Sequence, residues 1–235
     1  MKRTAATRLK SSTRLHCYVL LTDYKFLSVV NRRKSILIKN DMPKITRDSL
    51  MTLEAYAKAR VDFRTRVIEH KKTRTVALGA HVTLIFEDEL TMRYQIQEML
   101  RVEKIFEERG IQDELDAYNP MIPDGGNWKA TMMIEYPEVD ERQRMLAKLI
   151  GIEDRVWARI AGFTPVYAIA DEDLDRSTDE KTAAVHFLRF EIDAKMQQAL
   201  KNGAALAMGV DHPAYRTSAD PLAAPVRDAL MQDFS

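Results

Sequence analysis

Cysteine is almost absent from this sequence. Cys17 is the only cysteine among 235 residues, so the chain cannot close an internal disulfide, a cysteine-ligated iron–sulfur site or a CxxC redox pair. Long hydrophobic runs are missing as well. No stretch reaches the ~18 apolar residues of a membrane-spanning helix, and the apolar run 17–22 is too short for a secretory signal. We therefore expect a cytoplasmic protein that does not bind a membrane.

Glycine is scarce too, and none of the eight glycines forms a phosphate-binding loop. The motifs GxGxxG, GxxxxGK(S/T), HExxH and GxSxG do not occur, which argues against dinucleotide enzymes, P-loop NTPases, zinc proteases and serine hydrolases. The paired Glu-x-x-His motifs of a di-iron four-helix bundle are also missing. No cofactor is therefore detectable from the sequence, although a divalent metal is compatible with it.

The charge is unevenly distributed along the chain. The formal net charge is +1, but residues 1–41 hold ten basic and two acidic residues, a net +8, which leaves −7 on the other 194. Because Met42-Pro43-Lys44 resembles a natural protein start, we expect 1–41 to be a basic extension that is disordered or lies outside the natural start. The acidic remainder argues against a nucleic-acid partner. Nucleic-acid binding through 1–41 stays a lesser alternative.

Hydrophobic periodicity and turn residues divide the rest of the chain into short elements. Helices are expected at 46–64, 89–109, 138–150 and 193–201, with a helical turn at 111–118. Strands are expected at 76–88 (one strand, or two around Gly79), 128–136, 155–160, 165–170, 182–192 and 204–210. The order shows no regular βαβ rhythm. It predicts a single α+β domain over 42–215, with a largely antiparallel sheet, helices packed on it and a C-terminal tail at 216–235.

The helix predicted at 89–109, which Gly110 would end, carries a polar candidate site. Glu103 and Gln95 fall on its apolar face, where a carboxylate must be paired, metal-bound or protonated. Glu103 is therefore either a functional carboxyl with a raised pKa or one half of a buried structural pair. Glu98 and Arg101 lie off that face and are expected to form a surface ion pair.

Two histidines lie on the apolar faces of predicted strands. His186 shares a face with Leu188, and His212 shares one with Met208. If the sheet brought both histidines under Glu103, the three side chains would form a catalytic acid–base or metal-binding site. Arg101 or Arg189 would then orient an anionic substrate. The alternative is that each histidine is an ordinary hydrogen-bonded core residue.

Two loops carry further polar residues. The loop 119–127 is specified by two prolines and two glycines, and we expect it either to line a binding face through Asn119, Asp124 and Asn127 or to cap the sheet. The segment 171–175 spaces its acids like a calcium loop but lacks the required glycine, so we expect an acidic connection there.

Four strings of the sequence resemble the bacterial domain-of-unknown-function family 3501. They are VALGAHVTLIFEDELTMRYQIQEMLR at 76–101, GIQDELDAYNPMIPDGGNWKATMMIEYP at 110–137, AVHFLRFE at 184–191 and GVDHPAY at 209–215. The resemblance implies no activity and no catalytic residues. It implies a setting, because such proteins are often encoded beside a rubrerythrin-like protein and an iron–sulfur oxidoreductase.

These observations lead to two functional hypotheses. The first is an accessory or binding protein that serves such a redox or peroxide-stress system, with those two proteins as partners. The alternative is a small metal-dependent or acid–base enzyme that uses His186, His212 and Glu103.

Overall fold

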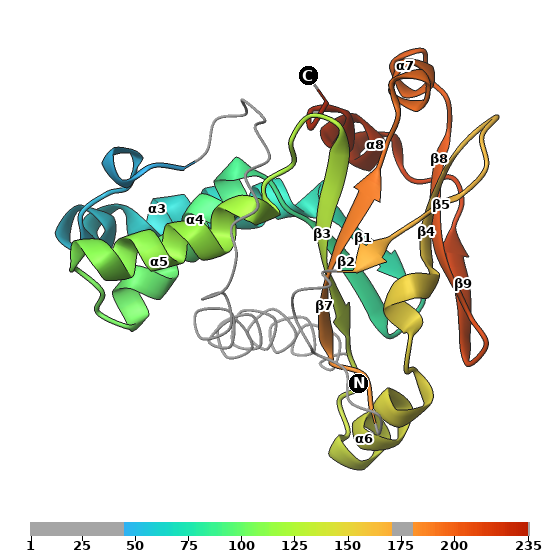
Figure 1. Ribbon diagram of the computed structural model, residues 1–235, viewed down its shortest axis with the longest axis horizontal. Coiled ribbons are helices and arrows are strands. Elements are labelled where there is room, and N and C mark those ends of the chain that lie inside the picture. The colour runs from blue at the N-terminus through green and yellow to red at the C-terminus, as the bar shows by residue number, and fades with distance from the viewer. Residues whose placement is uncertain (1–44, 171–180, 235) are drawn as a thin grey trace, which may run out of the picture.

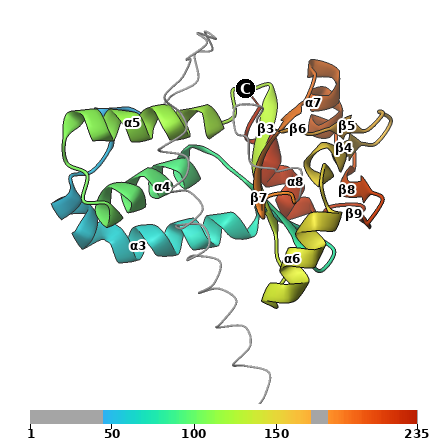
Figure 2. The same cartoon turned by 60° about the horizontal axis from the view of Figure 1, so that its bottom comes forward.

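The computed structural model describes residues 45–170 and 181–234, and these form an α+β domain in three layers. One layer holds the helices α3 (Leu53–Lys72), α4 (Glu89–Val102) and α5 (Glu108–Tyr118). They extend away from one face of a five-stranded sheet, and a four-stranded sheet lies against its other face (Figures 1 and 2). The predicted fold class is confirmed. The basic extension expected at 1–41 and the acidic connection expected at 171–175 lie outside the described residues.

Every strand pair in both sheets is antiparallel. Sheet A has the order β1-β2-β3-β7-β6, formed by Thr75–Leu78, Val82–Phe86, Asn127–Ile134, Val185–Glu191 and Ile169–Ala170. Sheet B has the order β5-β4-β8-β9, formed by Val166–Tyr167, Val156–Ile160, Leu206–His212 and Tyr215–Ala219. The segment expected as one strand at 165–170 is two strands, β5 and β6, and the chain passes from sheet B to sheet A at Ala168.

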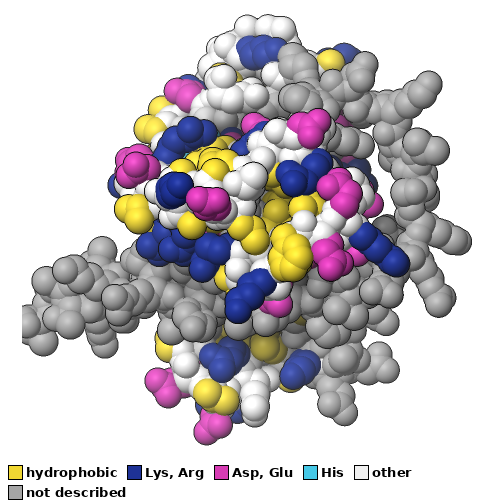
Figure 3. Space-filling view, turned by 90° about the vertical axis from the view of Figure 1, so that its left-hand side faces the viewer, with side chains coloured by type: hydrophobic (Ala, Val, Ile, Leu, Met, Phe, Trp, Pro, Cys, Tyr) yellow, Lys and Arg dark blue, Asp and Glu magenta, His cyan; other side chains and the backbone are white. Residues whose placement is uncertain are grey.

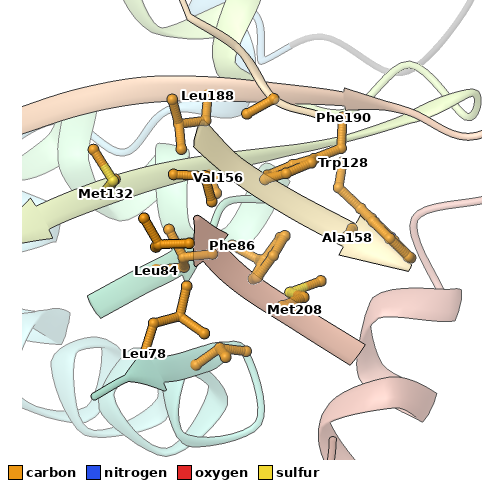
Figure 4. Close-up of a cluster of buried hydrophobic side chains, with 14 of the residues drawn as sticks. Leu78, Leu84, Phe86, Trp128, Met132, Val156, Ala158, Leu188, Phe190 and Met208 are labelled. Atoms are coloured by element: carbon orange, nitrogen blue, oxygen red, sulfur yellow. The ribbon is translucent and has the colours of Figure 1, made fainter. Parts of the chain in front are cut away.

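The main core lies between the two sheets. Alternate residues of each strand point into it, among them Leu84 and Phe86 of β2, Trp128 of β3 and Met208 of β8 (Figure 4). Trp128 is fully buried and meets the Phe86 ring edge-to-face at a centroid separation of 6.2 Å. A second core on the helix side of sheet A joins α4 and α5 to Phe187 of β7. This burial is the main source of the stability of the fold.

The segment 216–234 is part of this fold. The tail boundary expected after residue 215 is wrong, because β9 begins at Tyr215 and the helix α8 (Ala224–Met231) closes one end of the sandwich. The indole Nε1 of Trp128 donates to the Leu230 carbonyl at 2.9 Å, and the Phe234 ring lies 5.1 Å from the indole. Three short helices connect strands earlier in the chain: α6 (Val139–Lys148), the 3-10 helix η4 (Ile152–Arg155) and α7 (Ala194–Lys201).

The first helix begins later than predicted. A separate 3-10 turn, η2 (Arg47–Ser49), precedes it, and Thr52 is the N-cap of α3, with its side chain accepting from the Ala55 amide at 3.2 Å. The predicted strand at 76–88 is two strands, and Gly79 lies in the turn with φ 71°. Glycine is required there, because an added Cβ would lie 2.7 Å from the Tyr215 hydroxyl.

The segment predicted as one helix at 89–109 contains α4, a turn and the first two residues of α5, which continues to Tyr118. Lys104 adopts a left-handed φ of 54°, and the Ile105 amide donates to the Leu100 carbonyl at 2.9 Å. These two features are the Schellman ending of a helix, in which glycine usually occupies the place that Lys104 takes here. Gly110 lies inside α5 and ends no helix. Among the residues described, no helix is long and apolar enough to cross a membrane.

Candidate functional site

His186 and His212 lie in different sheets, and neighbouring groups satisfy each ring. His186 of β7 has Nε2 2.9 Å from the Thr182 hydroxyl and 3.0 Å from the Ala183 carbonyl, with a Glu153 oxygen at 3.9 Å. Both histidines are buried. His186 therefore fixes the position of residues 182–183, which lead into β7.

His212 has a similar structural role at the end of β8. Its Nε2 lies 3.1 Å from the Ile150 carbonyl, and its Nδ1 accepts from the Ala214 amide at 3.2 Å. A carbonyl accepts only from N–H, so this pattern selects the neutral Nε2–H tautomer. His81, in the turn between β1 and β2, stacks on Tyr136 with their ring centroids 4.0 Å apart.

Glu103 does not join these histidines. It caps the C-terminal end of α4 and is exposed. Within 45–170 and 181–234, no three His, Asp, Glu or Cys side chains form a group that could hold a metal ion. The described residues thus do not assemble the predicted site of His186, His212 and Glu103.

The polar residues of the loop 119–127 bond within the fold. The Asn119 side chain accepts from the Ile45 amide at 2.9 Å and donates to the Ile45 carbonyl at 3.0 Å. Asp124 accepts from the Gly126 amide at 3.0 Å, and Asn127, which is buried, accepts from the Asp124 amide at 3.3 Å. These contacts fit the alternative that the loop caps the sheet. The loop begins with a 3-10 turn, η3 (Asn119–Met121).

The predicted ion pair of Glu98 and Arg101 forms at 3.2 Å, but its expected position at the surface is wrong, because Glu98 is buried. Only 1% of Glu98 is exposed. Arg60 donates two hydrogen bonds to its carboxylate, at 2.7 and 2.9 Å. The Tyr56 hydroxyl and Arg101 donate to the same carboxylate at 2.6 and 3.2 Å. Burial alone would raise the pKa of Glu98, but the hydrogen bonds from Arg60, Tyr56 and Arg101 outweigh it and lower the pKa to about 2. Sequence spacing identifies Arg101 as a partner of Glu98 but not Arg60, which lies on α3.

The remaining binding candidates lie apart from one another. Gln95 is buried in the middle of α4. Arg189 of β7 is partly exposed and forms an ion pair with Glu191 on its own strand. The predicted residues therefore do not converge on one site.

Among the residues described, several buried side-chain atoms have no hydrogen-bond partner, and they include Glu87 Oε2, Gln95 Nε2 and Glu114 Oε2. Glu87 follows β2 and accepts from the Thr131 hydroxyl at 2.7 Å through its other oxygen. Such groups are rare in folded proteins because an unpaired buried polar atom is costly, and they are found where a ligand, water or proton completes the site. Sequence analysis identified only Gln95 among them.

Glu114 is a buried carboxyl whose pKa is raised. It lies on α5, only 3% exposed, beside the apolar residues Ile111 and Leu115. Burial and then the negative charges of Glu103 and Asp113 raise its pKa to about 7. The sequence predicted this property for Glu103. The sequence could have indicated Glu114 too, because it lies on the same helical face as the apolar residues Ile111 and Leu115.

Comparison with known proteins assigns the family. The model of a protein family of unknown function, DUF3501, matches residues 44–234. The chain belongs to the DUF3501 family. It is also similar to a crystal structure of a novel protein of unknown function from Burkholderia pseudomallei K96243, with 56% sequence identity and a TM-score of 0.78. That match covers 82% of this chain and 100% of the other. No functionally curated protein matches.

The end of the helical layer exposes apolar side chains in this DUF3501 protein. Phe106, in the turn between α4 and α5, is 73% exposed, and Val102 at the end of α4 is 39% exposed. Figure 3 views this end, where hydrophobic side chains gather among charged ones. Residues 103–118 carry six acidic and two basic side chains. We call Val102, Phe106 and this acidic segment the α4–α5 tip.

Proposed function

We propose that this protein is a cytoplasmic accessory protein that binds the components of a redox or peroxide-stress system, namely a rubrerythrin-like protein and an iron–sulfur oxidoreductase. The observation that carries the proposal is the α4–α5 tip. A phenylalanine that is 73% exposed costs free energy unless a partner covers it, and aromatic side chains are frequent anchors of protein interfaces.

The setting implied by the family resemblance names the two partners. The charge of the tip indicates which kind of surface a partner must have. Five of the six acidic side chains in 103–118 are exposed, all except the buried Glu114, and so are both basic ones. The tip therefore fits a basic surface that has an apolar pocket for Phe106. Charges around such an anchor accelerate encounter and select the partner.

The proposal is tested by purifying the tagged full-length protein from its native cell and probing for the two partners. Recovery of either partner from wild type, and its loss from Phe106→Asp, supports the proposal. Val139→Asp is the matched control, because Val139 is 54% exposed on α6, away from the tip. Recovery of neither partner contradicts the proposal.

A second candidate is a small acid–base enzyme, and Glu114 favours it. Its raised pKa of about 7 gives both protonation states near neutrality, which suits a general acid–base group. Loss of a measured turnover in Glu114→Gln, with folding preserved, would support this candidate. Elemental analysis of protein purified without chelator tests whether a divalent metal takes part.

A further inference from the structure

Trp157 lies flat across the outer face of sheet B. In β4 its neighbours Val156 and Ala158 point into the core, so Trp157 points outward. Directly opposite on β8 is Gly209. A Cβ on Gly209 would fall well inside van der Waals contact with the indole and 2.7 Å from its Cε2 atom. The absence of a side chain at position 209 thus lets the indole rest on the sheet. No described helix covers this side (Figure 1).

Arg159 extends the same flat surface. Its guanidinium carbon lies 5.6 Å from the centre of the Trp157 ring, and its Nη2 donates to Asp220 at 2.6 Å. The residue opposite it on β8 is the small Ala207, so the arginine crosses the sheet from β4 to the end of β9. The side chains of Arg159 and Asp220 are 44% and 45% exposed. An ion pair this exposed contributes little to stability.

A pocket of about 280 Å³ adjoins this surface. It is lined by Arg159, Ala161, Gly162, Ala205, Ala207 and Asp220. Small side chains form its floor, and the Arg159–Asp220 pair forms its charged wall. The volume is at the lower end of small-molecule sites, so the pocket suits a compact ligand.

The other side of Trp157 is bordered by Tyr167, opposite it on β5. Tyr167 is 44% exposed, and its hydroxyl donates to Asp211 at 2.7 Å. That hydrogen bond raises the pKa of Tyr167, and the nearby positive charge of Arg155 works against it. Asp211 is opposite Arg216 of β9. Arg155 and Arg216 thus lie near Tyr167 and Asp211, as Arg159 does near Trp157 and Asp220.

We propose that the outer face of sheet B binds a small planar anion of the nucleoside monophosphate class. The base stacks on the outward face of the half-buried Trp157, as bases stack on aromatic side chains elsewhere. The phosphate occupies the adjoining pocket and replaces Asp220 as the hydrogen-bond partner of Arg159. Arginine pairs well with phosphate because its guanidinium donates two parallel hydrogen bonds. This ligand is independent of docking at the α4–α5 tip.

The two tryptophans make a direct test possible. Trp128 is fully buried in the core, so a ligand-induced change in fluorescence reports on Trp157. Adenosine monophosphate is titrated into the full-length protein, with calorimetry as a second readout. We expect saturable binding that loses its fluorescence signal in Trp157→Phe and weakens about tenfold in Arg159→Gln. Arg144→Gln, an exposed arginine on α6, should leave binding unchanged.

The ligand comparisons separate the base from the phosphate. Adenosine without phosphate should bind about tenfold more weakly, and inorganic phosphate should compete without altering the fluorescence. Absence of saturable binding, or equal affinity in Arg159→Gln, overturns the proposal. Much tighter binding of a single-stranded oligonucleotide than of the mononucleotide would also overturn it, by assigning the face to nucleic acid. Phe106→Asp should bind the mononucleotide normally, which separates this result from the docking function.

Discussion

Arg74 Nη2 lies 2.6 Å from Asp233 Oδ2 and so joins the residue before β1 to the end of the described chain. The arginine is 2% exposed, and its Nε and Nη1 donate to the carbonyls of Phe86 and Ala229 at 3.0 and 3.2 Å. Nη2 also donates to the Glu87 carbonyl at 3.1 Å. A single guanidinium thus connects sheet A to α8. This contact explains why 216–234 forms part of the domain.

Arg74→Met is expected to destabilise the protein by about 3–5 kcal/mol, because it leaves the buried Asp233 carboxylate and three carbonyls without their donor. Chemical denaturation measures this loss. Lys72→Met removes an exposed positive charge two residues earlier and should change stability by no more than about 0.5 kcal/mol. Equal effects of the two substitutions would refute the structural role of Arg74.

Glu98→Gln is expected to cost about 3 kcal/mol, since Arg60 and Arg101 would lose a buried counter-charge. The pKa of Glu98 is lowered, so its contribution is complete above its unfolded pKa and is lost as the pH falls through about 2. The control is Glu54→Gln, which breaks only an exposed pair with Lys58 on the same helix layer. A thermal or denaturant series that ranks the two variants equally would contradict this account.

Glu114 has the opposite pH dependence. Because its pKa is raised from 4.5 to about 7 in the folded protein, stability is highest below the unfolded pKa and falls as the pH rises through 7. Glu114→Gln removes this titration and should gain about 3 kcal/mol relative to wild type between about pH 4 and about pH 8. Denaturation at the two pH values tests this. Asp116→Asn, on the exposed face of the same helix, should behave like wild type.

Gly209→Ala is expected to lift Trp157 from sheet B, because the new methyl group would also lie 2.7 Å from the Thr217 carbonyl. The cost should be about 1–3 kcal/mol, with a shift of the tryptophan emission towards that of a solvent-exposed indole. In Gly126→Ala the nearest heavy atom lies 3.5 Å from the added Cβ, so this control should leave the emission unchanged. An unaltered emission spectrum in Gly209→Ala would argue against the described packing.

The strand pattern was predictable because inward and outward residues alternate. The faces assigned to Leu188 and Met208 are those observed in the core. The division into two sheets was not predictable, since it depends on which strands pair across long stretches of chain. This division separates His186 from His212, and a pattern of single strands contains no information about it.

The candidate carboxyl was misplaced for a local reason. Glycine is the usual signal for the end of a helix, and Lys104 takes its place at the end of α4. The predicted helix therefore continued through Glu103 and kept that residue on an apolar face. Glu98 was misjudged because its principal partner, Arg60, is 38 residues away in the sequence.

The central claim is that the α4–α5 tip docks a redox partner. It is tested most directly by titrating the purified rubrerythrin-like protein and the purified iron–sulfur oxidoreductase against the full-length chain by calorimetry, at low and at high salt. We predict saturable binding to at least one of them that weakens with salt, is lost in Phe106→Asp and is retained in Val139→Asp. Binding to neither protein, or equal binding by both variants, would contradict the claim.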